Sequence, residues 1–235
     1  LFYLNVFFLI LYFIYNFLNA LNIDEIEHIY SSWLISKGEI PYCDFFQHHH
    51  PLIWYILAPG FLLFGEGIVS VFFIRLFNFA LFSGILFFIY RITKEITHSK
   101  IMALFSFSIA LSTNFFVKNI LEFRPDVLMT FFALWSFWFF VKFWRTQHTV
   151  NLIGAGLLMG FSFITLQKAV FYIIPFFGIF IYLLAVKKVK LRHILITGAA
   201  ALLLFVFFII FYQLSGFLKE YVVYNWIFNL LKAKK

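Results

Sequence analysis

Long segments without charged residues constrain the fold of this chain most. The first, residues 1–21, is as long as the roughly 20 apolar residues that a helix needs to cross a bilayer. It has no basic start and no small-residue cleavage pattern, so it predicts a transmembrane helix and not a removable signal. Similar segments, one of them containing Arg75, recur along the chain. We expect spans at residues 1–21, 68–90, 101–117, 127–141, 152–166, 169–186 and 194–212.

The composition excludes a soluble globular protein. Hydrophobic residues make up 64% of the 235 residues and charged residues 12%, against roughly 45–50% and about 25% in soluble domains. A chain of this length cannot enclose 39 Phe behind so thin a polar surface, so lipid must be the solvent for most of it. We therefore predict an all-α fold, with about seven transmembrane helices in a single domain, residues 1–235. The lone Cys43 cannot form an internal disulfide.

The basic residues predict which ends of the spans face the cytoplasm. They concentrate in three alternate connections, which hold Arg91, Lys94 and Lys100, then Lys142 and Arg145, then Lys187, Lys188, Lys190 and Arg192. The positive-inside rule predicts that these three connections are cytoplasmic. Residues 22–50, 118–126 and 167–168 then lie outside, and of the ten acids only Glu95 lies inside. The concentration of basic residues on the inner side explains the net charge of +8 as a feature of membrane topology, so nucleic acid is not an expected partner.

The first outer loop, residues 22–65, is expected to carry interfacial helices. Asp24 and Glu27 have capping-box spacing. The same segment contains one apolar helical stripe: Ile26, Tyr30, Trp33 and Leu34. These features predict a short amphipathic helix on the membrane surface. Residues 51–64 are apolar but short and broken by Pro59 and Gly60, which suits an interfacial or a re-entrant helix.

Asp24 is the first candidate for a functional carboxylate. A helix N-terminus favours a nearby anion, which keeps Asp24 ionised and able to act as a base. The alternative is that Asp24 only caps the helix. Two adjacent carboxylates, Asp24 and Glu25, at the junction of two membrane-associated helices are more than one cap requires.

Three consecutive histidines, at positions 48–50, precede Pro51. Their side chains diverge along either a strand or a helix, so all three cannot bind one metal ion. One of them with a carboxylate could hold a divalent metal ion, with His48 and His50 as candidates. Phosphate contact by the imidazoles is a second interpretation. A solvated turn that leads into the next helix is the third.

Several motifs together resemble a known family. They are Asp24-Glu25, His28, Gly38, Pro41-Tyr42, Asp44, His50-Pro51-Leu52, Leu63-Phe64-Gly65 and Arg75. In this order they resemble the N-terminal portion of the polyprenyl-phosphate-sugar-dependent glycosyltransferases of the GT-C superfamily. The chain is similar to dolichyl-phosphate-mannose protein mannosyltransferases and to the lipid A aminoarabinose transferase. Residues 122–126 resemble the acidic position of that family at the outer end of its fourth helix, and the resemblance covers about residues 1–215.

The resemblance implies an integral membrane enzyme of the plasma membrane. Such an enzyme transfers a sugar from a polyprenyl-phosphate donor to an acceptor on the outer face, with inversion, and its other partners are membrane lipids. By this likeness Asp24 activates the acceptor hydroxyl, beside Glu25, and Asp126 is a second acidic site residue. Because the departing lipid phosphate needs cations or hydrogen-bond donors, its candidate partners are His49, His50, Arg124 and Lys168. His28 and Asp44 are further loop candidates, and a divalent metal ion is the one cofactor left open.

The chain also departs from the aminoarabinose transferases. Those proteins carry an Arg soon after the Asp-Glu pair and a Glu-Lys before the Pro, whereas this chain has Glu27-His28 and His48-His49. Aminoarabinose is therefore not an expected substrate. The C-terminal helices and outer domain of the family are missing, and the first residue is Leu, so truncation at both ends is expected.

Other interpretations stay open. Arg124 and Asp126 could form an ordinary helix cap, and Lys168 could be an interfacial anchor. Arg75, within a predicted span, could be functional, could extend outward or could pair with Glu66. A transporter or flippase would favour ionisable residues within the spans and an internal repeat, yet nearly all the acids lie at the outer surface and no repeat is seen. A non-catalytic membrane scaffold is a third class.

Overall fold

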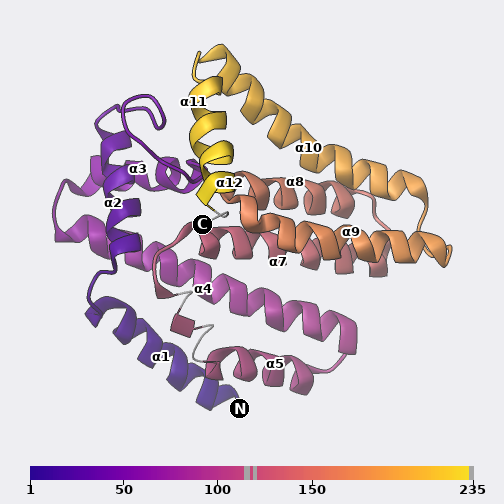
Figure 1. Ribbon diagram of the computed structural model, residues 1–235. Helices are drawn as coiled ribbons and strands as arrows, with labels where there is room; N and C mark the ends of the chain where they lie inside the picture. Colours follow the sequence, from indigo (N-terminus) through magenta and orange to yellow (C-terminus); the bar gives the residue numbers. More distant parts are fainter. Residues whose placement is uncertain (114–116, 119–120, 233–235) are drawn as a thin grey trace.

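The computed structural model describes residues 1–113, 117–118 and 121–232. In this part of the chain every regular element is a helix (Figure 1), so the all-α prediction is confirmed. The elements are α1 (Phe2–Leu18), α2 (Ile23–Ser36), α3 (Leu52–Phe64), α4 (Ile68–Thr97), α5 (Lys100–Ser112), α7 (Pro125–Thr146), α8 (Val150–Thr165), η1 (Gln167–Ala169), α9 (Val170–Ala185), α10 (Leu191–Leu214), α11 (Leu218–Val222), η2 (Val223–Ile227) and α12 (Phe228–Lys232).

Four of these helical segments are long and apolar enough to cross a membrane: α4, α7, η1 with α9, and α10. Helices α1 and α2, which meet at a bend of 71°, add a fifth if they form one broken span. The predicted spans at 101–117 and 152–166 correspond to the shorter apolar helices α5 and α8. The number of about seven spans therefore stays a prediction. Residues 114–116 of the predicted span 101–117 and residues 119–120 of the predicted outer connection 118–126 lie outside the described residues.

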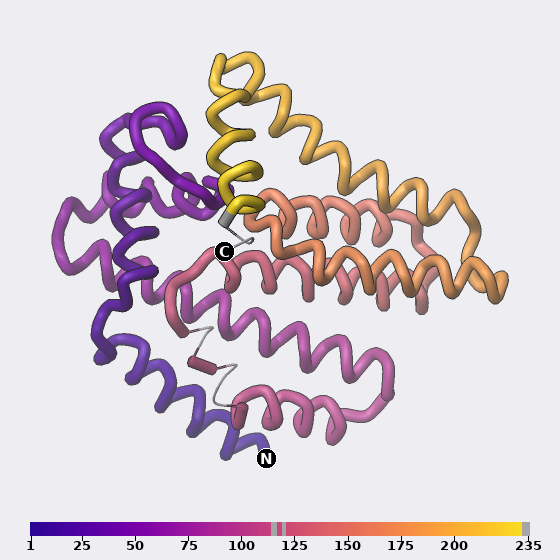
Figure 2. The backbone as a smooth tube through the Cα atoms, in the orientation of Figure 1, coloured from indigo at the N-terminus to yellow at the C-terminus, as the bar shows by residue number. Residues whose placement is uncertain are grey.

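The connections between the long helices gather at two opposite ends of the bundle (Figure 2). The α4–α5, α7–α8 and α9–α10 connections lie together at one end, and an ion pair between Arg145 and Glu95 joins the ends of α7 and α4 there. At the other end, Lys168 of η1 pairs with Asp126 at the start of α7 at 3.1 Å. The predicted basic connections thus share one end, and the predicted acidic residues of α2 and α7 lie at the other.

Apolar packing joins the helices, and a large apolar surface stays exposed. Side chains of α4, such as Phe82 and Leu86, are fully buried in a core shared with α3 and α7. Helix α8 approaches α10 closely at Gly160, where the lack of a side chain permits the contact. A Cβ added to Gly160 would lie 2.7 Å from the carbonyl oxygen of Ala201. Much of α10 faces outward, and Leu202 and Phe207 are 61% and 65% exposed. Such a surface suits lipid contact.

Helix α2 is amphipathic, as predicted, and its polar face is the buried one. Glu25, His28 and Ser32 are buried, whereas Ile26 and Tyr30 of the predicted apolar stripe are 51% and 55% exposed. Leu34, at the far end of that stripe, is buried. The helix therefore directs its polar side chains into the protein and half of its apolar stripe, Ile26 and Tyr30, outward, which suits a helix at a lipid surface.

The predicted cap of α2 is wrong. Asn22, not Asp24, is the N-cap: the Asn22 side chain accepts a hydrogen bond from the Asp24 amide at 3.4 Å, and the Glu25 carboxylate accepts from the Asn22 amide at 3.0 Å. Asn22 has the extended backbone that an N-cap requires. As a result the Asp24 carboxylate takes no part in capping.

Candidate active site

A polar cavity of about 280 Å³ lies where α2, the segment before α3, the start of α7 and η1 meet. Its lining residues are Asp24, Glu27, His28, His48, His49, Arg124, Pro125, Asp126 and Lys168. Most of these residues were predicted as site candidates from the sequence. Glu27 was missed as a site residue, because its spacing from Asp24 suggested only a capping role. The signal that could have found it is its position one helical turn after Asp24, which puts both carboxylates on one face.

Asp24 presents its carboxylate to this cavity from the first turn of α2. Its side chain is 45% exposed, and one oxygen lies 3.1 Å from the Arg124 guanidinium. The first-turn amides of α2 favour a negative charge at this position. Asp24 is therefore an accessible carboxylate, held in place by one cation and free of capping.

Glu25 lies on another face of α2 and is buried. One carboxylate oxygen accepts a hydrogen bond from the Phe123 amide at 3.2 Å, and the other lies 3.5 Å from the Arg75 guanidinium. Arg75 in turn donates to the Asn19 carbonyl at 2.7 Å. These contacts tie α2 to α4 and to the segment before α7, which suits a positioning role for Glu25.

Arg75 does not pair with Glu66, so that predicted alternative is wrong. Glu66 lies outside the long helices and forms an ion pair with Lys37. Both of those side chains are about half exposed, at 49% for Lys37 and 56% for Glu66. Arg75 pairs with Glu25 because the start of α2 lies against α4, a contact between residues far apart in the sequence.

Arg124 is the centre of a charge network on the cavity wall. Its guanidinium lies 3.1 Å from Asp24 and 3.9 Å from both Glu122 and Asp126. Asp126 also contacts Lys168 at 3.1 Å. Arg and Lys side chains carry five and three N–H donors respectively, so both cations can contact an anionic ligand while they keep these partners. The network links the two predicted carboxylates, Asp24 and Asp126, through Arg124, and Lys168 extends it beyond Asp126.

Burial favours the neutral form of two of the cavity histidines, His28 and His49. Burial lowers the pKa of His28 to about 4, against opposing contributions from Asp24 and Asp126. Burial, with contributions from His48 and His28, lowers the pKa of His49 to about 2. The Nδ1 atom of His28 accepts a hydrogen bond from the Trp54 indole at 3.2 Å. These rings therefore serve as hydrogen-bonding groups or as metal ligands, and phosphate contact by a protonated imidazole is not supported.

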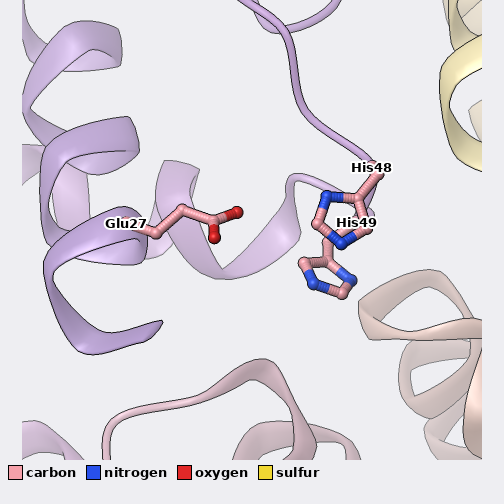
Figure 3. A group of neighbouring side chains, drawn as sticks. All are labelled: Glu27, His48 and His49. Atoms are coloured by element: carbon pink, nitrogen blue, oxygen red, sulfur yellow. The ribbon is translucent and has the colours of Figure 1, made fainter. Parts of the chain in front are cut away.

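His48 and His49 do not diverge as the sequence analysis expected. Their ring centroids lie 4.0 Å apart, and both residues line the cavity. Together with Glu27 they bring three potential ligand atoms within 4.8 Å of one another (Figure 3). Two of the three histidines, and not one, could therefore hold a metal ion with a carboxylate.

Two predicted site residues lie away from the described cavity lining. His50 is fully buried among aromatic side chains, and its Nδ1 lies 3.1 Å from the Tyr221 hydroxyl. This arrangement contradicts a shared metal site for His48 and His50. Asp44 is exposed, and its carboxylate accepts a hydrogen bond from the Ile40 amide at 2.7 Å inside a turn. Both residues have structural partners that the sequence alone did not indicate.

A comparison with models of protein families identifies the family of the chain. The family model described as dolichyl-phosphate-mannose-protein mannosyltransferase matches residues 48–212. No curated protein and no solved structure matches the chain significantly. The family match includes residues 48–50, Arg124, Asp126 and Lys168, whereas residues 24–28 precede it. Because the match extends over more than half of the 235 residues, the chain is an integral membrane protein that belongs to the dolichyl-phosphate-mannose-protein mannosyltransferase family, of the GT-C type.

Proposed function

We propose that this protein transfers a sugar from a polyprenyl-phosphate donor to an acceptor hydroxyl, with inversion, at the outer face of the plasma membrane. One observation carries the proposal: a single polar cavity holds an accessible carboxylate, Asp24, together with two cations, Arg124 and Lys168. Sugar transfer needs both kinds of group, a base for the acceptor and positive charge for the departing phosphate.

The chemistry follows from these roles. The Asp24 carboxylate takes the proton of the acceptor hydroxyl as its oxygen attacks C1 of the sugar. The bond between C1 and the phosphate oxygen breaks, and the lipid phosphate leaves with the bonding electron pair. Arg124 and Lys168 stabilise its negative charge, while Asp126 holds Lys168 at 3.1 Å. A single displacement at C1 inverts the configuration of the sugar, because the acceptor enters opposite the leaving phosphate.

An apolar groove beside the cavity supports a lipid-linked donor. This groove, of about 540 Å³, lies between α8, α9 and α10 and is lined by Met159, Gly160, Phe163, Val170, Ile173, Phe177, Gly198, Ala201, Leu202 and Phe205. Its α9 wall begins at Val170, two residues after Lys168 of the polar cavity. A polyprenyl chain in the groove would therefore have its phosphate near Lys168. A nucleotide donor would leave the groove without a role.

The charge distribution supports the outer face as the side on which the cavity lies. The basic connections lie at the end of the bundle opposite the cavity. The positive-inside rule assigns that basic end to the cytoplasm. The cavity then opens on the outer face, where nucleotide sugars are not available and a lipid-linked donor is required.

A transfer assay with two donors tests the proposal. Membranes that contain the protein are supplied with radiolabelled polyprenyl-phosphate mannose or with a labelled nucleotide sugar, and acceptor-bound label is measured. We expect transfer from the lipid-linked donor alone. Movement of the labelled lipid across the bilayer, with the sugar still attached to the lipid, would instead indicate a flippase. Equal transfer from the nucleotide sugar would contradict the proposed donor class.

A further inference from the structure

Three potential metal ligands from two separate segments meet at one wall of the polar cavity. Glu27 lies on α2, whereas His48 and His49 lie in the segment before α3. A carboxylate oxygen of Glu27 and one ring nitrogen of each histidine all lie within 4.8 Å of one another. In Figure 3 the Glu27 side chain points from its helix toward the two imidazole rings.

The backbone of the two histidines is anchored so that both rings reach the cavity. The Asn229 side-chain amide donates a hydrogen bond to the carbonyl of His48 at 2.7 Å, and the Tyr42 hydroxyl donates to the carbonyl of His49. Consecutive side chains of an extended segment normally point to opposite sides. The two anchors hold the segment in a conformation in which the rings instead lie 4.0 Å apart.

A second observation also points to a ligand. The Nδ1 atom of His49 is buried and has no hydrogen-bond partner among the residues that the structure describes. Buried polar atoms are nearly always paired, and an unpaired one costs free energy. A buried imidazole nitrogen without a partner, beside a carboxylate and a second imidazole, is an environment that a bound cation would complete.

We infer that Glu27, His48 and His49 bind one divalent transition-metal ion of the zinc type and leave a coordination position open toward the cavity. Zinc accepts two imidazole nitrogens and one carboxylate oxygen at about 2.0–2.2 Å, so the three side chains would rotate to bring their ligand atoms to that distance from the ion. Magnesium and calcium prefer sites built from oxygen ligands, so they suit this set less well. Three protein ligands leave a fourth position for water or for an oxygen of a substrate.

The open position faces the side chains that the proposed function uses. Asp24, Arg124 and Lys168 line the same cavity as the three ligands. An oxygen of the donor phosphate is negatively charged, so the metal ion, Arg124 and Lys168 would all attract it. A metal ion at this position would stabilise the departing phosphate. This role at the phosphate rests on the proposed function, whereas binding of the metal ion does not.

Zinc content and zinc-dependent stability test the site without an activity assay. The purified protein is stripped with a chelator and then dialysed against zinc. We expect one zinc ion per chain and a higher unfolding temperature with zinc than without. Glu27→Gln, His48→Ala and His49→Ala should each weaken zinc binding by at least about 100-fold, because loss of even a supporting partner of a ligand costs 10–100-fold. His148→Ala is the matched control, because His148 is exposed and lies between α7 and α8 at the opposite end.

Each outcome bears on the site. Wild-type zinc binding in all three variants, or no zinc retained by the unaltered protein, would overturn it. The unfolding temperature without zinc identifies a variant that fails to fold, and Glu27→Gln should match the wild type there because it keeps the size of the side chain. Full sugar transfer by the stripped protein would overturn the role at the phosphate. Zinc binding without transfer from a lipid-linked donor would contradict the proposed function and support the metal site.

Discussion

The Glu25 carboxylate lies 3.5 Å from the Arg75 guanidinium, and the two side chains are only 4% and 6% exposed. This buried pair joins the first turn of α2 to α4 and fixes the helix that carries Asp24 at the cavity. The two adjacent acids of the sequence therefore have different surroundings, because one is enclosed by partners and the other is open to the cavity. We expect them to respond differently to substitution.

Glu25→Gln should lower the free energy of unfolding by about 3–5 kcal/mol, because it leaves the Arg75 charge buried without its partner. Unfolding of the purified protein in detergent measures this change. Glu66→Gln is the matched control: it removes an exposed carboxylate from the Lys37 ion pair and should change stability little. Equal stabilities of the two variants would show that the buried pair does not fix α2.

Cys43 offers a direct test of the orientation, because it is the sole cysteine in the sequence and is exposed in the first loop. A membrane-impermeant maleimide added to intact cells should label it. In a Cys43→Ser background, His148→Cys at the basic end should be labelled only after the membrane is permeabilised. The reverse pattern of labelling would contradict the assignment of the cavity to the outer face.

Gly198→Leu should raise the KM for the lipid-linked donor by about tenfold or more, because it fills part of the groove between α8, α9 and α10. An added Cβ at Gly198 meets nothing within 4 Å, so the backbone should tolerate the change. Gly178→Leu on α9 is the control, since Gly178 also has open space around it and does not line the groove. Similar KM values for the two variants would argue against a lipid chain in the groove.

Arg124→Gln should lower kcat/KM by about 10²–10³-fold, because it removes a cation that stabilises the departing phosphate. Arg124→Lys should lose less, since it keeps the charge without the planar fork of donors. The control is Arg145→Gln, at the opposite end of the bundle, where Arg145 pairs with Glu95. Steady-state transfer rates of the three variants test this assignment, and unchanged kcat/KM in Arg124→Gln would exclude it.

The helical architecture and the two charged ends could be predicted because both depend on local patterns. Apolar segments of sufficient length indicate helices, and the basic connections identify one end of the bundle. The acids and cations of the cavity, including Asp24, Arg124 and Lys168, were also found from the sequence, because they are among its few charged residues. The number of spans was harder to predict, since α5 and α8 are shorter than a full crossing.

The partners of individual side chains could not be predicted, because they depend on distant contacts. The N-cap of α2 is an exception, because Asn22 with Glu25 has the same local capping-box spacing as Asp24 with Glu27, and the structure selects the first pair. The arrangement of His48 and His49 depends on Asn229, which is 181 residues from His48 in the sequence. No local pattern contains that information, so the Glu27 cluster became visible only in the structure.

Asp24→Asn tests the role of Asp24 as the base. The substitution keeps the size of the side chain but removes the base that would accept the proton of the acceptor hydroxyl, so it should lower the rate of sugar transfer by about 10²–10⁴-fold. The measurement is single-turnover transfer from polyprenyl-phosphate sugar, with the unfolding temperature compared to verify the fold. Glu39→Gln, a loop acid outside the cavity lining, is the control and should transfer at the wild-type rate. We expect near-complete loss of transfer in folded Asp24→Asn, and transfer at the wild-type rate by that variant would exclude Asp24 as the base.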